Sequence, residues 1–416
     1  MKLRRLLGGA AACVLVMLII TYIGFSSKNN KVIQKVTNEE QIIRIMAPDE
    51  GSVHKQALEE TARNYSAVRG NKQVEIQFIS QENFQKEICM RTDEGTNTDL
   101  IICENTMMPS LIDMDILEDL TAYIKGNVKS RYWQNLWTNA ISDGKYYGVP
   151  FTSDPYVVFY NKDLMKKEKQ EVPDTWDELL EVCDHINGLG NYGFGFAAKQ
   201  PEEVTAFFMQ MLYSCGGSLR EVNGNAGNQV FQLLLQLKNR KQISPDTMNW
   251  SQSDLAHEFA KGHIAMMAGN ASMASILRTT RLGFEVGVAG MPSGKKEAYL
   301  LHGKNIGITK SGDIQEAKKF LDYIREPDVA NFLTKEMDTV PVLVEVKYKK
   351  KKIGPDQALV SDYMKNGVTK GAYDSWFDIS GAVANGIYGI LHERNVSIKN
   401  IGDTMQDKVR VALIDK

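Results

Sequence analysis

The chain has 416 residues, 43% of them hydrophobic and 24% charged, which is typical of a globular protein with room for two domains. Its formal net charge of −2 provides no broad basic surface, so no nucleic-acid partner is expected. The sequence contains no motif of a catalytic serine, a zinc protease or a phosphate-binding loop, and we expect neither a metal nor a cofactor.

Residues 1–27 have the pattern of an N-terminal signal or anchor segment. Basic residues between Lys2 and Arg5 precede an uncharged run over 6–25, an arrangement that directs the rest of a chain across a membrane. Such a run covers roughly 30 Å as a helix, a bilayer core, whereas the apolar part of a cleavable signal usually has about 7–15 residues. We therefore favour an uncleaved anchor over a removed signal peptide. A polar tether over 28–40 follows, and both alternatives place the remainder outside the cytoplasm.

Strands and helices alternate after the tether and predict an α/β lobe with a doubly wound sheet. Apolar patterns indicate a strand over 42–46, a helix over 52–68, a strand over 74–79 and a buried strand over 99–103. Ligands of such sheets bind beyond the carboxyl ends of the strands. Glu50 and Glu104, which follow the first and third strands, are therefore candidate ligand-binding residues, although ordinary loop polarity would explain them equally well.

The stretch 143–164 predicts a passage of the chain from one lobe to another. Asp143-Gly144 is a two-residue hairpin turn, because both central residues of a type I′ turn need positive φ. A strand, the polar residues 152–155 and a second apolar strand over 156–160 follow it without a long loop. A strand that is interrupted by polar residues and then continues suggests a chain that leaves one lobe and enters the next.

This stretch and the helix start at 172–180 resemble the crossover of bacterial extracellular solute-binding proteins, the ligand-capturing subunits of ABC importers. The similarity is greatest to the carbohydrate-binding, maltose-binding-protein-like branch, whose members read roughly Gly-Lys-x-Tyr-Gly-Val-Pro, Tyr-Asn-Lys-Asp-Leu and Pro-x-Thr-Trp. A second match over 259–270 has a helix, a strand and then Asn270 before the next helix. Sugar binders often have a tryptophan just after this point. Its absence here weakens the sugar assignment or means that ring stacking comes from elsewhere.

The resemblance covers about residues 41–416 and implies an α/β, two-lobed fold of the periplasmic-binding-protein type. We expect one lobe from 41–153 with 307–340 and the other from 154–306 with 341–416. Each lobe should have its own mostly parallel sheet flanked by helices, and three crossing segments should form a hinge. A cleft between the lobes would then close on a ligand.

The resemblance also implies a function: binding without chemistry. The protein would capture a carbohydrate, a short oligosaccharide, in the inter-lobe cleft and deliver it to the transmembrane permease subunits of an ABC importer. A monomer is expected. Binding of a polyamine, a peptide or an iron complex is the first alternative. An extracytoplasmic glycosidase is the second, because the strand ends supply the two carboxylates that such an enzyme needs.

The resemblance adds further candidate ligand-binding residues to the strand-end residues Glu50 and Glu104. In sugar binders an aromatic side chain at the position of Trp376 stacks on the ligand, and Tyr213 lies on a helix that faces the cleft. The alternative for Trp376 is burial against a helix start. Glu50 and Asp154 would accept hydrogen bonds from hydroxyls. The full set is Glu50, Glu104, Asp154, Tyr213, Asn270, Gly303 and Trp376, with Asn270 at a helix N-terminus and Gly303 where the backbone could approach a sugar.

Two further features leave alternatives open. Cys89 with Cys103 and Cys183 with Cys215 fall within one lobe each, so two disulfides are conceivable, but we favour free buried thiols. The lysine-rich run over 347–352 is expected to be a solvated face, with contact to an anionic membrane or wall polymer as the alternative.

Overall fold

The computed structural model describes residues 42–70, 72–80, 83–84, 86–88, 90, 98–187, 190–393, 395 and 397–414. The predicted anchor and tether lie outside these residues, and so does Cys89. Among the residues that are described, no helix combines the length and the apolar character needed to cross a membrane.

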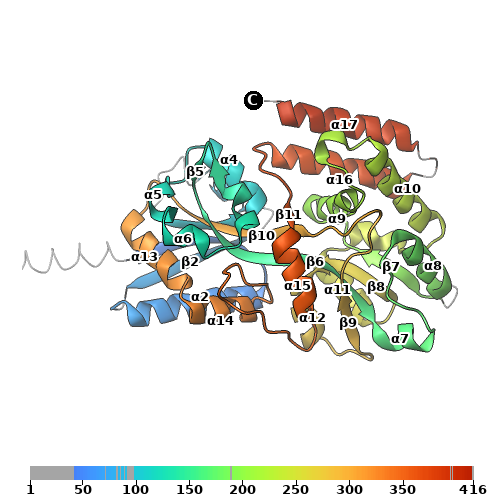
Figure 1. Cartoon of the computed structure of the whole chain (residues 1–416), viewed down its shortest axis with the longest axis horizontal. Coiled ribbons are helices and arrows are strands. Elements are labelled where there is room, and N and C mark those ends of the chain that lie inside the picture. Colours follow the sequence, from blue (N-terminus) through green and yellow to red (C-terminus); the bar gives the residue numbers. More distant parts are fainter. Residues whose placement is uncertain are drawn as a thin grey trace, which may run out of the picture.

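The chain forms two lobes side by side, with β6 running through the middle of the molecule from one to the other (Figure 1). The elements of the first lobe are β1 (Ile42–Asp49), α2 (Ser52–Val68), β2 (Gln73–Ser80), β3 (Leu100–Glu104), η1 (Asn105–Met107), α4 (Met108–Asp113), α5 (Thr121–Ile124), α6 (Asn127–Ser130), η2 (Gln134–Ala140), β4 (Ile141–Ser142), β5 (Lys145–Tyr146), α13 (Ile314–Ile324) and α14 (Pro327–Glu336). The elements that join the lobes or lie at their junction are β6 (Val149–Asn161), β10 (Leu300–Ile308), α15 (Gln357–Asn366) and β11 (Val368–Thr369).

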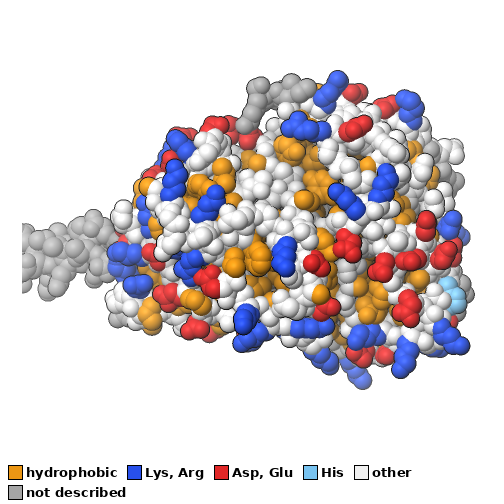
Figure 2. Space-filling view, in the orientation of Figure 1, with side chains coloured by type: hydrophobic (Ala, Val, Ile, Leu, Met, Phe, Trp, Pro, Cys, Tyr) orange, Lys and Arg blue, Asp and Glu red, His pale blue; other side chains and the backbone are white. Residues whose placement is uncertain are grey.

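The second lobe contains the long helices that close the chain. Its elements are α7 (Lys162–Lys167), α8 (Trp176–Asn187), β7 (Tyr192–Phe196), α9 (Pro201–Ser214), η3 (Leu219–Glu221), α10 (Asn225–Asn239), η4 (Pro245–Asn249), α11 (Gln252–Ala260), β8 (Ile264–Asn270), η5 (Ala271–Met273), α12 (Ala274–Thr279), β9 (Val286–Ala289), α16 (Trp376–His392) and α17 (Ile398–Ile414). Charged side chains of both signs are interspersed over both lobes on the face shown in Figure 2.

The strands form one hydrogen-bonded path in the order β2-β1-β3-β10-β6-β8-β7, with β9 and β11 attached to β6 and β10. β1, β2 and β3 are parallel, but β10 is antiparallel to β3, and β6 is antiparallel to both β8 and β9. The predicted two-lobed α/β fold is confirmed, whereas the separate, mostly parallel sheets are not. The reason is the length of β6, whose first part pairs with β10 and whose second part pairs with β8.

Each lobe nevertheless has a hydrophobic core of its own. Ile45, Ile102 and Trp137 are buried in the first, and Phe194, Phe207 and Trp376 in the second. Leu343 and Val346, which follow the predicted boundary at 340, pack against the first core, so the exact domain limits stay a prediction. Separate cores joined by a few strands permit the lobes to move against one another.

Three segments pass between the lobes next to one another. β6 and β10 are antiparallel neighbours, and the N–H of Val340 donates a hydrogen bond to the carbonyl of Ser153 at 2.8 Å. Ser153 is fully buried and lies near the middle of β6. The predicted three-segment hinge therefore corresponds to backbone that is paired rather than to free loops.

The described cysteines are free and buried, as favoured for Cys103, Cys183 and Cys215. The conceivable bridge between Cys183 and Cys215 is therefore excluded. The bridge from Cys103 to Cys89 involves a residue outside the described part of the chain.

Gly303 is required at the point where β10 approaches β6. Its φ is +154°, and a Cβ atom built on it would lie 2.1 Å from the carbonyl oxygen of Thr152. The space that a side chain would occupy is therefore filled by the neighbouring strand. This close approach gives a reason for glycine that differs from the predicted contact with a sugar.

We expect Gly303→Ala to lower the free energy of unfolding by about 1–3 kcal/mol, the order of cost for a strained backbone position. Urea denaturation of both proteins would measure it. Gly381→Ala is the matched control, because a Cβ at this helical position meets nothing within 4 Å. The control should be stabilised by about 0.5–1 kcal/mol, since alanine favours a helix over glycine. Equal changes in unfolding free energy for Gly303→Ala and Gly381→Ala would contradict the conclusion that only glycine fits at position 303.

Candidate functional site

A buried lysine joins the ends of two strands in the first lobe. The ammonium of Lys304, on β10, lies 2.5 Å from Oε1 of Glu50 and 3.2 Å from Oε1 of Glu104. Glu50 directly follows β1 and Glu104 ends β3, so the parallel pairing of these strands brings both carboxylates to one edge. The structure thus brings together two predicted site residues around a cation that the sequence reasoning did not select.

The charges of this cluster stabilise one another. Burial by itself raises the pKa of Glu50, but the Lys304 ammonium and a hydrogen bond with His54 lower it to about 2. Burial by itself lowers the pKa of Lys304, yet Glu104 and Glu50 raise it well above its ordinary value. Nδ1 of His54 lies 3.0 Å from Oε2 of Glu50, and its Nε2 lies 3.1 Å from the carbonyl oxygen of Met337. All of these groups are therefore held in fixed positions.

Asp154 faces the cluster from the crossing strand β6. Burial raises the pKa of its carboxyl to about 6, although hydrogen bonds from Ser272 and the charges of Lys304 and His54 oppose the rise. The backbone N–H of Ser272 donates to Oδ1 of Asp154 at 3.0 Å. At neutral pH Asp154 is therefore a carboxylate. One of its oxygens accepts a hydrogen bond from Ser272 of the second lobe, and a carboxylate of this kind can also accept hydrogen bonds from ligand hydroxyls.

Asn270 and His302 add polar atoms beside Asp154. Asn270 ends β8 and His302 pairs with Asp154 across the β6–β10 ladder. Within the described residues, Oδ1 of Asn270 and Nε2 of His302 are buried and have no hydrogen-bond partner. Burial, followed by the charges of Lys370 and Lys304, lowers the pKa of His302 well below its ordinary value, so the ring is neutral. Buried atoms without partners are candidates for contact with a ligand.

Trp376 does not lie free in the cleft as predicted. Its side chain is 0% exposed in the core of the second lobe, and its Nε1 donates a hydrogen bond to Oε1 of Glu202 at 2.6 Å. The ammonium of Lys370 lies 5.6 Å from the ring centroid and 3.2 Å from Oε2 of Glu202. The alternative considered for Trp376, burial against a helix start, is the arrangement observed.

Among the described residues, no hydrogen bond or ion pair joins Tyr213 to the Lys304 cluster. Its ring packs against the core of the second lobe, and its hydroxyl donates a long hydrogen bond of 3.4 Å to the carbonyl of Thr369. A ligand-stacking role for Tyr213 or Trp376 therefore stays a prediction that the observed contacts do not favour.

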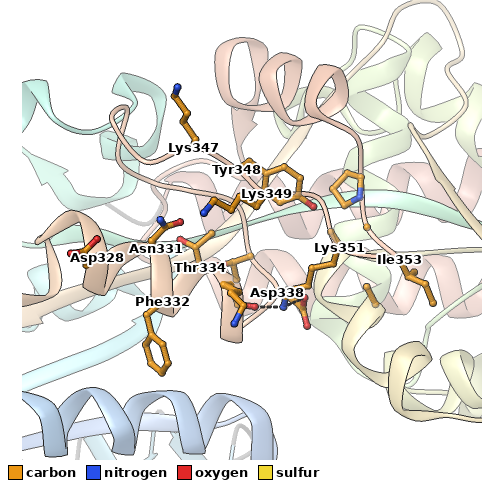
Figure 3. Close-up of a pocket in the computed structure, with 16 residues that line it drawn as sticks. Asp328, Asn331, Phe332, Thr334, Asp338, Lys347, Tyr348, Lys349, Lys351 and Ile353 are labelled. Atoms are coloured by element: carbon orange, nitrogen blue, oxygen red, sulfur yellow. Dashed lines mark hydrogen bonds and ion pairs between the residues drawn. The ribbon is translucent and has the colours of Figure 1, made fainter.

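A cavity of about 200 Å³ opens between the lobes. Its walls come from α14 of the first lobe, from residues 347–355, and from Ala271 and Ala274 of the second lobe. Figure 3 shows Tyr348 above Thr334 of α14. Burial raises the pKa of the Tyr348 hydroxyl to about 12. Tyr348 is therefore a half-buried aromatic ring in the cavity wall, the kind of group that we had expected from Trp376.

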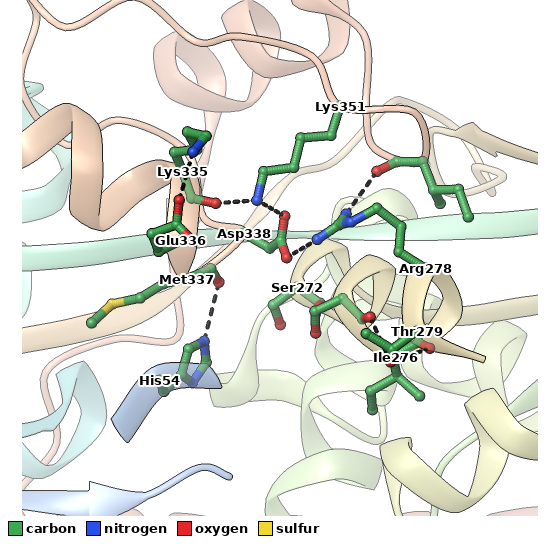
Figure 4. A network of polar contacts seen from close by, with 12 residues as sticks. His54, Ser272, Ile276, Arg278, Thr279, Lys335, Glu336, Met337, Asp338 and Lys351 are labelled. Carbon is green, nitrogen blue, oxygen red and sulfur yellow. Dashed lines mark hydrogen bonds and ion pairs between the residues drawn. The ribbon is translucent and has the colours of Figure 1, made fainter. Parts of the chain in front are cut away.

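A second charge network connects this cavity to the strand-end cluster (Figure 4). The buried carboxylate of Asp338 accepts hydrogen bonds from Arg278 of α12 and lies 2.6 Å from the ammonium of Lys351. Asp338 directly follows Met337, whose carbonyl contacts His54. These contacts join the cavity wall to the Lys304 cluster, and the charge of Asp154 also acts on the Tyr348 hydroxyl in that wall.

Sequence reasoning missed Lys304, His54 and Tyr348 for different reasons. Lys304 lies in a strand that begins and ends with apolar residues, and a charge in such a strand was a signal of a paired, buried group. His54 lies one helical turn after Glu50, a spacing that permits contact. Tyr348 lies within the lysine-rich run, which we expected to be a solvated face.

Comparisons with known proteins agree on the kind of protein. A family model described as bacterial extracellular solute-binding protein matches residues 68–359. A Brucella abortus (strain 2308) protein named only as a binding protein is 25% identical over 297 residues, which are 68% of this chain and 72% of that one. The multiple sugar-binding protein of Streptococcus mutans is 26% identical over 208 residues, with 43% of this chain and 47% of that protein covered.

Solved structures show the same fold. Maltose-bound MalE3 of T. maritima superposes with a TM-score of 0.80 at 19% identity, covering 89% of this chain and 100% of that one. The GacH receptor of Streptomyces glaucescens, solved unliganded and with acarbose, gives a TM-score of 0.79 at 18% identity, covering 89% and 98%.

The pKa of Glu50 predicts a pH-dependent contribution to stability. The ordinary value of 4.5 is lowered to about 2 in the folded protein, so the contribution is fully present above pH 4.5 and is lost as the pH falls through 2. We expect Glu50→Gln to be less stable than wild type by about 3 kcal/mol at neutral pH, and by almost nothing below about pH 2.

Urea unfolding at several pH values would measure this difference. Glu181→Gln, which removes the same charge from an exposed site on α8, is the control and should change stability by less than about 0.5 kcal/mol. If the loss of unfolding free energy in Glu50→Gln stayed constant as the pH falls, the ion pair with Lys304 would not be the cause of that loss.

Proposed function

The chain belongs to the family of bacterial extracellular solute-binding proteins, and from this premise we propose that it captures a carbohydrate between its lobes. A short oligosaccharide is bound and then delivered to the transmembrane subunits of an ABC importer. The protein acts outside the cytoplasm as a monomer, tethered to the membrane by its N-terminal segment or released when that segment is removed.

The observation that carries this proposal is the polar composition of the inter-lobe site. Lys304 and its two glutamates face it from the first lobe, and Asp154 with Ser272 faces it from the second lobe. Carboxylates accept hydrogen bonds from sugar hydroxyls, whereas amides and ammonium groups donate to them. Closure of two lobes on such a ligand would surround it with both kinds of group.

The other ligand classes fit this site less well. A polyamine would meet the buried ammonium of Lys304, which already neutralises the strand-end carboxylates. The similar proteins whose names state a ligand include a multiple sugar-binding protein and a maltose-bound structure, which supports a sugar. An iron complex or a peptide has no specific observation in its favour.

Binding without turnover is preferred to glycosidase activity on a physical argument. A glycosidase needs one carboxylic acid whose pKa is raised, so that it can protonate the leaving group. The pKa of Glu50 is lowered to about 2, and Glu50 and Glu104 share one ammonium. This carboxylate pair is therefore suited to hold a charge network and not to donate a proton. Asp154 has a raised pKa of about 6, but its Oδ1 accepts the N–H of Ser272, and the glutamates that would be its catalytic partners are both bound to Lys304.

A thermal-shift screen of oligosaccharides, polyamines and peptides tests the ligand class. A ligand present at 100 times its Kd stabilises the folded state by about 2.7 kcal/mol, so the true class should raise the Tm measurably. We expect oligosaccharides alone to do so and to be recovered unhydrolysed. A shift with polyamines or peptides only, or hydrolysis of the sugar, would contradict the proposed function.

Asp154→Asn tests the place of binding. We expect the affinity for the saccharide found in the screen to fall by about 1–3 kcal/mol, because a hydroxyl donor would lose its charged acceptor. Isothermal calorimetry would compare it with Asp177→Asn, which removes an exposed carboxylate of α8 in the same lobe. Unchanged affinity in Asp154→Asn would place the ligand elsewhere.

A further inference from the structure

An ion pair crosses the junction between the lobes beside the cavity. The guanidinium of Arg278 donates a hydrogen bond to the carboxylate of Asp338. Asp338 directly follows Met337, which is buried in the core of the first lobe. Arg278 directly follows Leu277, which is buried among residues of the second lobe. Each partner is thus attached to the core of its own lobe, so the ion pair joins the two lobes.

A connection between the lobes adds a second cation to this pair. Val346 packs against the core of the first lobe, and Ile353 is buried with α11 and α12 in the second lobe. Lys351 lies in the chain between them, and its ammonium is 2.6 Å from Asp338. The same ammonium donates to a backbone carbonyl in the last turn of α14. Figure 4 shows Lys351 and Arg278 extending toward Asp338 from different segments.

Burial makes this network stronger than a surface ion pair. The side chain of Asp338 is 5% exposed, and those of Arg278 and Lys351 are 23% and 26% exposed. Charges that are shielded from water are screened little by salt, and the loss of one partner leaves the others without compensation. Separation of α14 from α12 would break this network, so the structure opposes that movement without any ligand.

Two contacts elsewhere on the junction are neutral. The hydroxyl of Ser110 on α4 donates to the carbonyl oxygen of Asp374, just before α16, at 2.6 Å. Nδ2 of Asn139 donates to the carbonyl oxygen of Gly371, also at 2.6 Å. Hydrogen bonds between neutral groups are roughly half as strong as charge-assisted ones. The ion pairs of Asp338 are therefore the stronger restraint on the lobes.

We propose that Asp338, Arg278 and Lys351 form a latch that holds α14 against α12 before any ligand is bound. Opening of the lobes on this side requires the ion pairs to break, so the latch sets the fraction of open molecules. When only a fraction of the molecules can bind, the apparent affinity for a ligand is reduced by that fraction. The inference goes beyond the proposed function, because it concerns the ligand-free protein.

Distances between two spin labels on the ligand-free full chain in mild detergent test the latch. The labels replace the exposed residues Asp328 on α14 and Arg281 after α12, and thus span the latch. Attachment through an unnatural amino acid leaves the native cysteines unmodified. Double electron–electron resonance then measures the distribution of distances between the labels. We expect one narrow distance in the protein with an intact latch.

Asp338→Asn removes the charge that both cations share. Asparagine tolerates the φ of +57° at this position as aspartate does, so the backbone can stay unchanged. We expect the ratio of short to long label distances to fall at least about tenfold, because two like charges then lie side by side without compensation. Arg278→Met removes the pair from the other lobe, keeps an unbranched side chain on α12, and should change the ratio in the same direction.

Arg240→Met is the matched control, because Arg240 forms its ion pair with Asp184, at 2.8 Å, within the second lobe. This variant should keep the distance distribution of the intact latch. Circular dichroism and the Tm of each variant show whether it is folded. If Asp338→Asn does not fold, Arg278→Met alone decides.

Three outcomes would overturn the latch. The first is an unchanged distance distribution in Arg278→Met, and the second is a broad distribution with the latch intact. The third is an equal change in Arg240→Met, which would indicate a general effect of losing an arginine. None of these measurements uses a saccharide, so the latch and the proposed function can fail independently of one another.

Discussion

The junction of the lobes depends on the buried ammonium of Lys304. β10 carries it into the space between two strand ends of the first lobe, where it neutralises Glu50 and Glu104. Removing one partner of a buried ion pair typically costs about 3–5 kcal/mol, because the remaining charge is left without compensation. The Lys304 ammonium is thus strongly held between Glu50 and Glu104. β10 must therefore pair with β3 and β6 in the register that brings Lys304 to these two carboxylates.

That register determines the geometry of the inter-lobe site. With Lys304 opposite Thr152, His302 lies opposite Asp154, and Gly303 provides the close approach that this pairing needs. Asp154 then binds the N–H of Ser272, which positions η5 and α12 and hence the Arg278 side chain that reaches Asp338. The cavity wall and the strand-end cluster therefore depend on one another through a short series of polar contacts.

The candidate site could be predicted only in part. The rule that ligands bind at the carboxyl ends of strands selected Glu50 and Glu104, because strand ends are visible in the sequence, and the structure brings both carboxylates to Lys304. Their contact with a ligand stays a prediction. Family resemblance placed Trp376 in the cleft, but the ring is buried in the core of the second lobe, where its Nε1 donates to Glu202, a residue 174 positions away in the chain. Tyr348 was overlooked because a lysine-rich run looks the same in sequence whether it faces solvent or covers a cavity.

The sequence by itself determined the local elements and the two-lobed fold. Asp143 and Gly144 form the predicted hairpin turn with φ values of 49° and 73°. Glu178 accepts hydrogen bonds from the N–H groups of Asp174 and Thr175, a local cap at the start of α8. Such features depend on residues a few positions apart, so periodicity and turn chemistry are sufficient to predict them. Only the tertiary structure decided that β6 pairs with strands of both lobes and that Asp154 lies near enough to Lys304 and Tyr348 for their charges to interact. The contacts of Lys304 with Glu50 and Glu104, and of Asp154 with Ser272, connect residues 254, 200 and 118 positions apart. Their energies depend on burial and charge pairing, which exist only after the chain has folded.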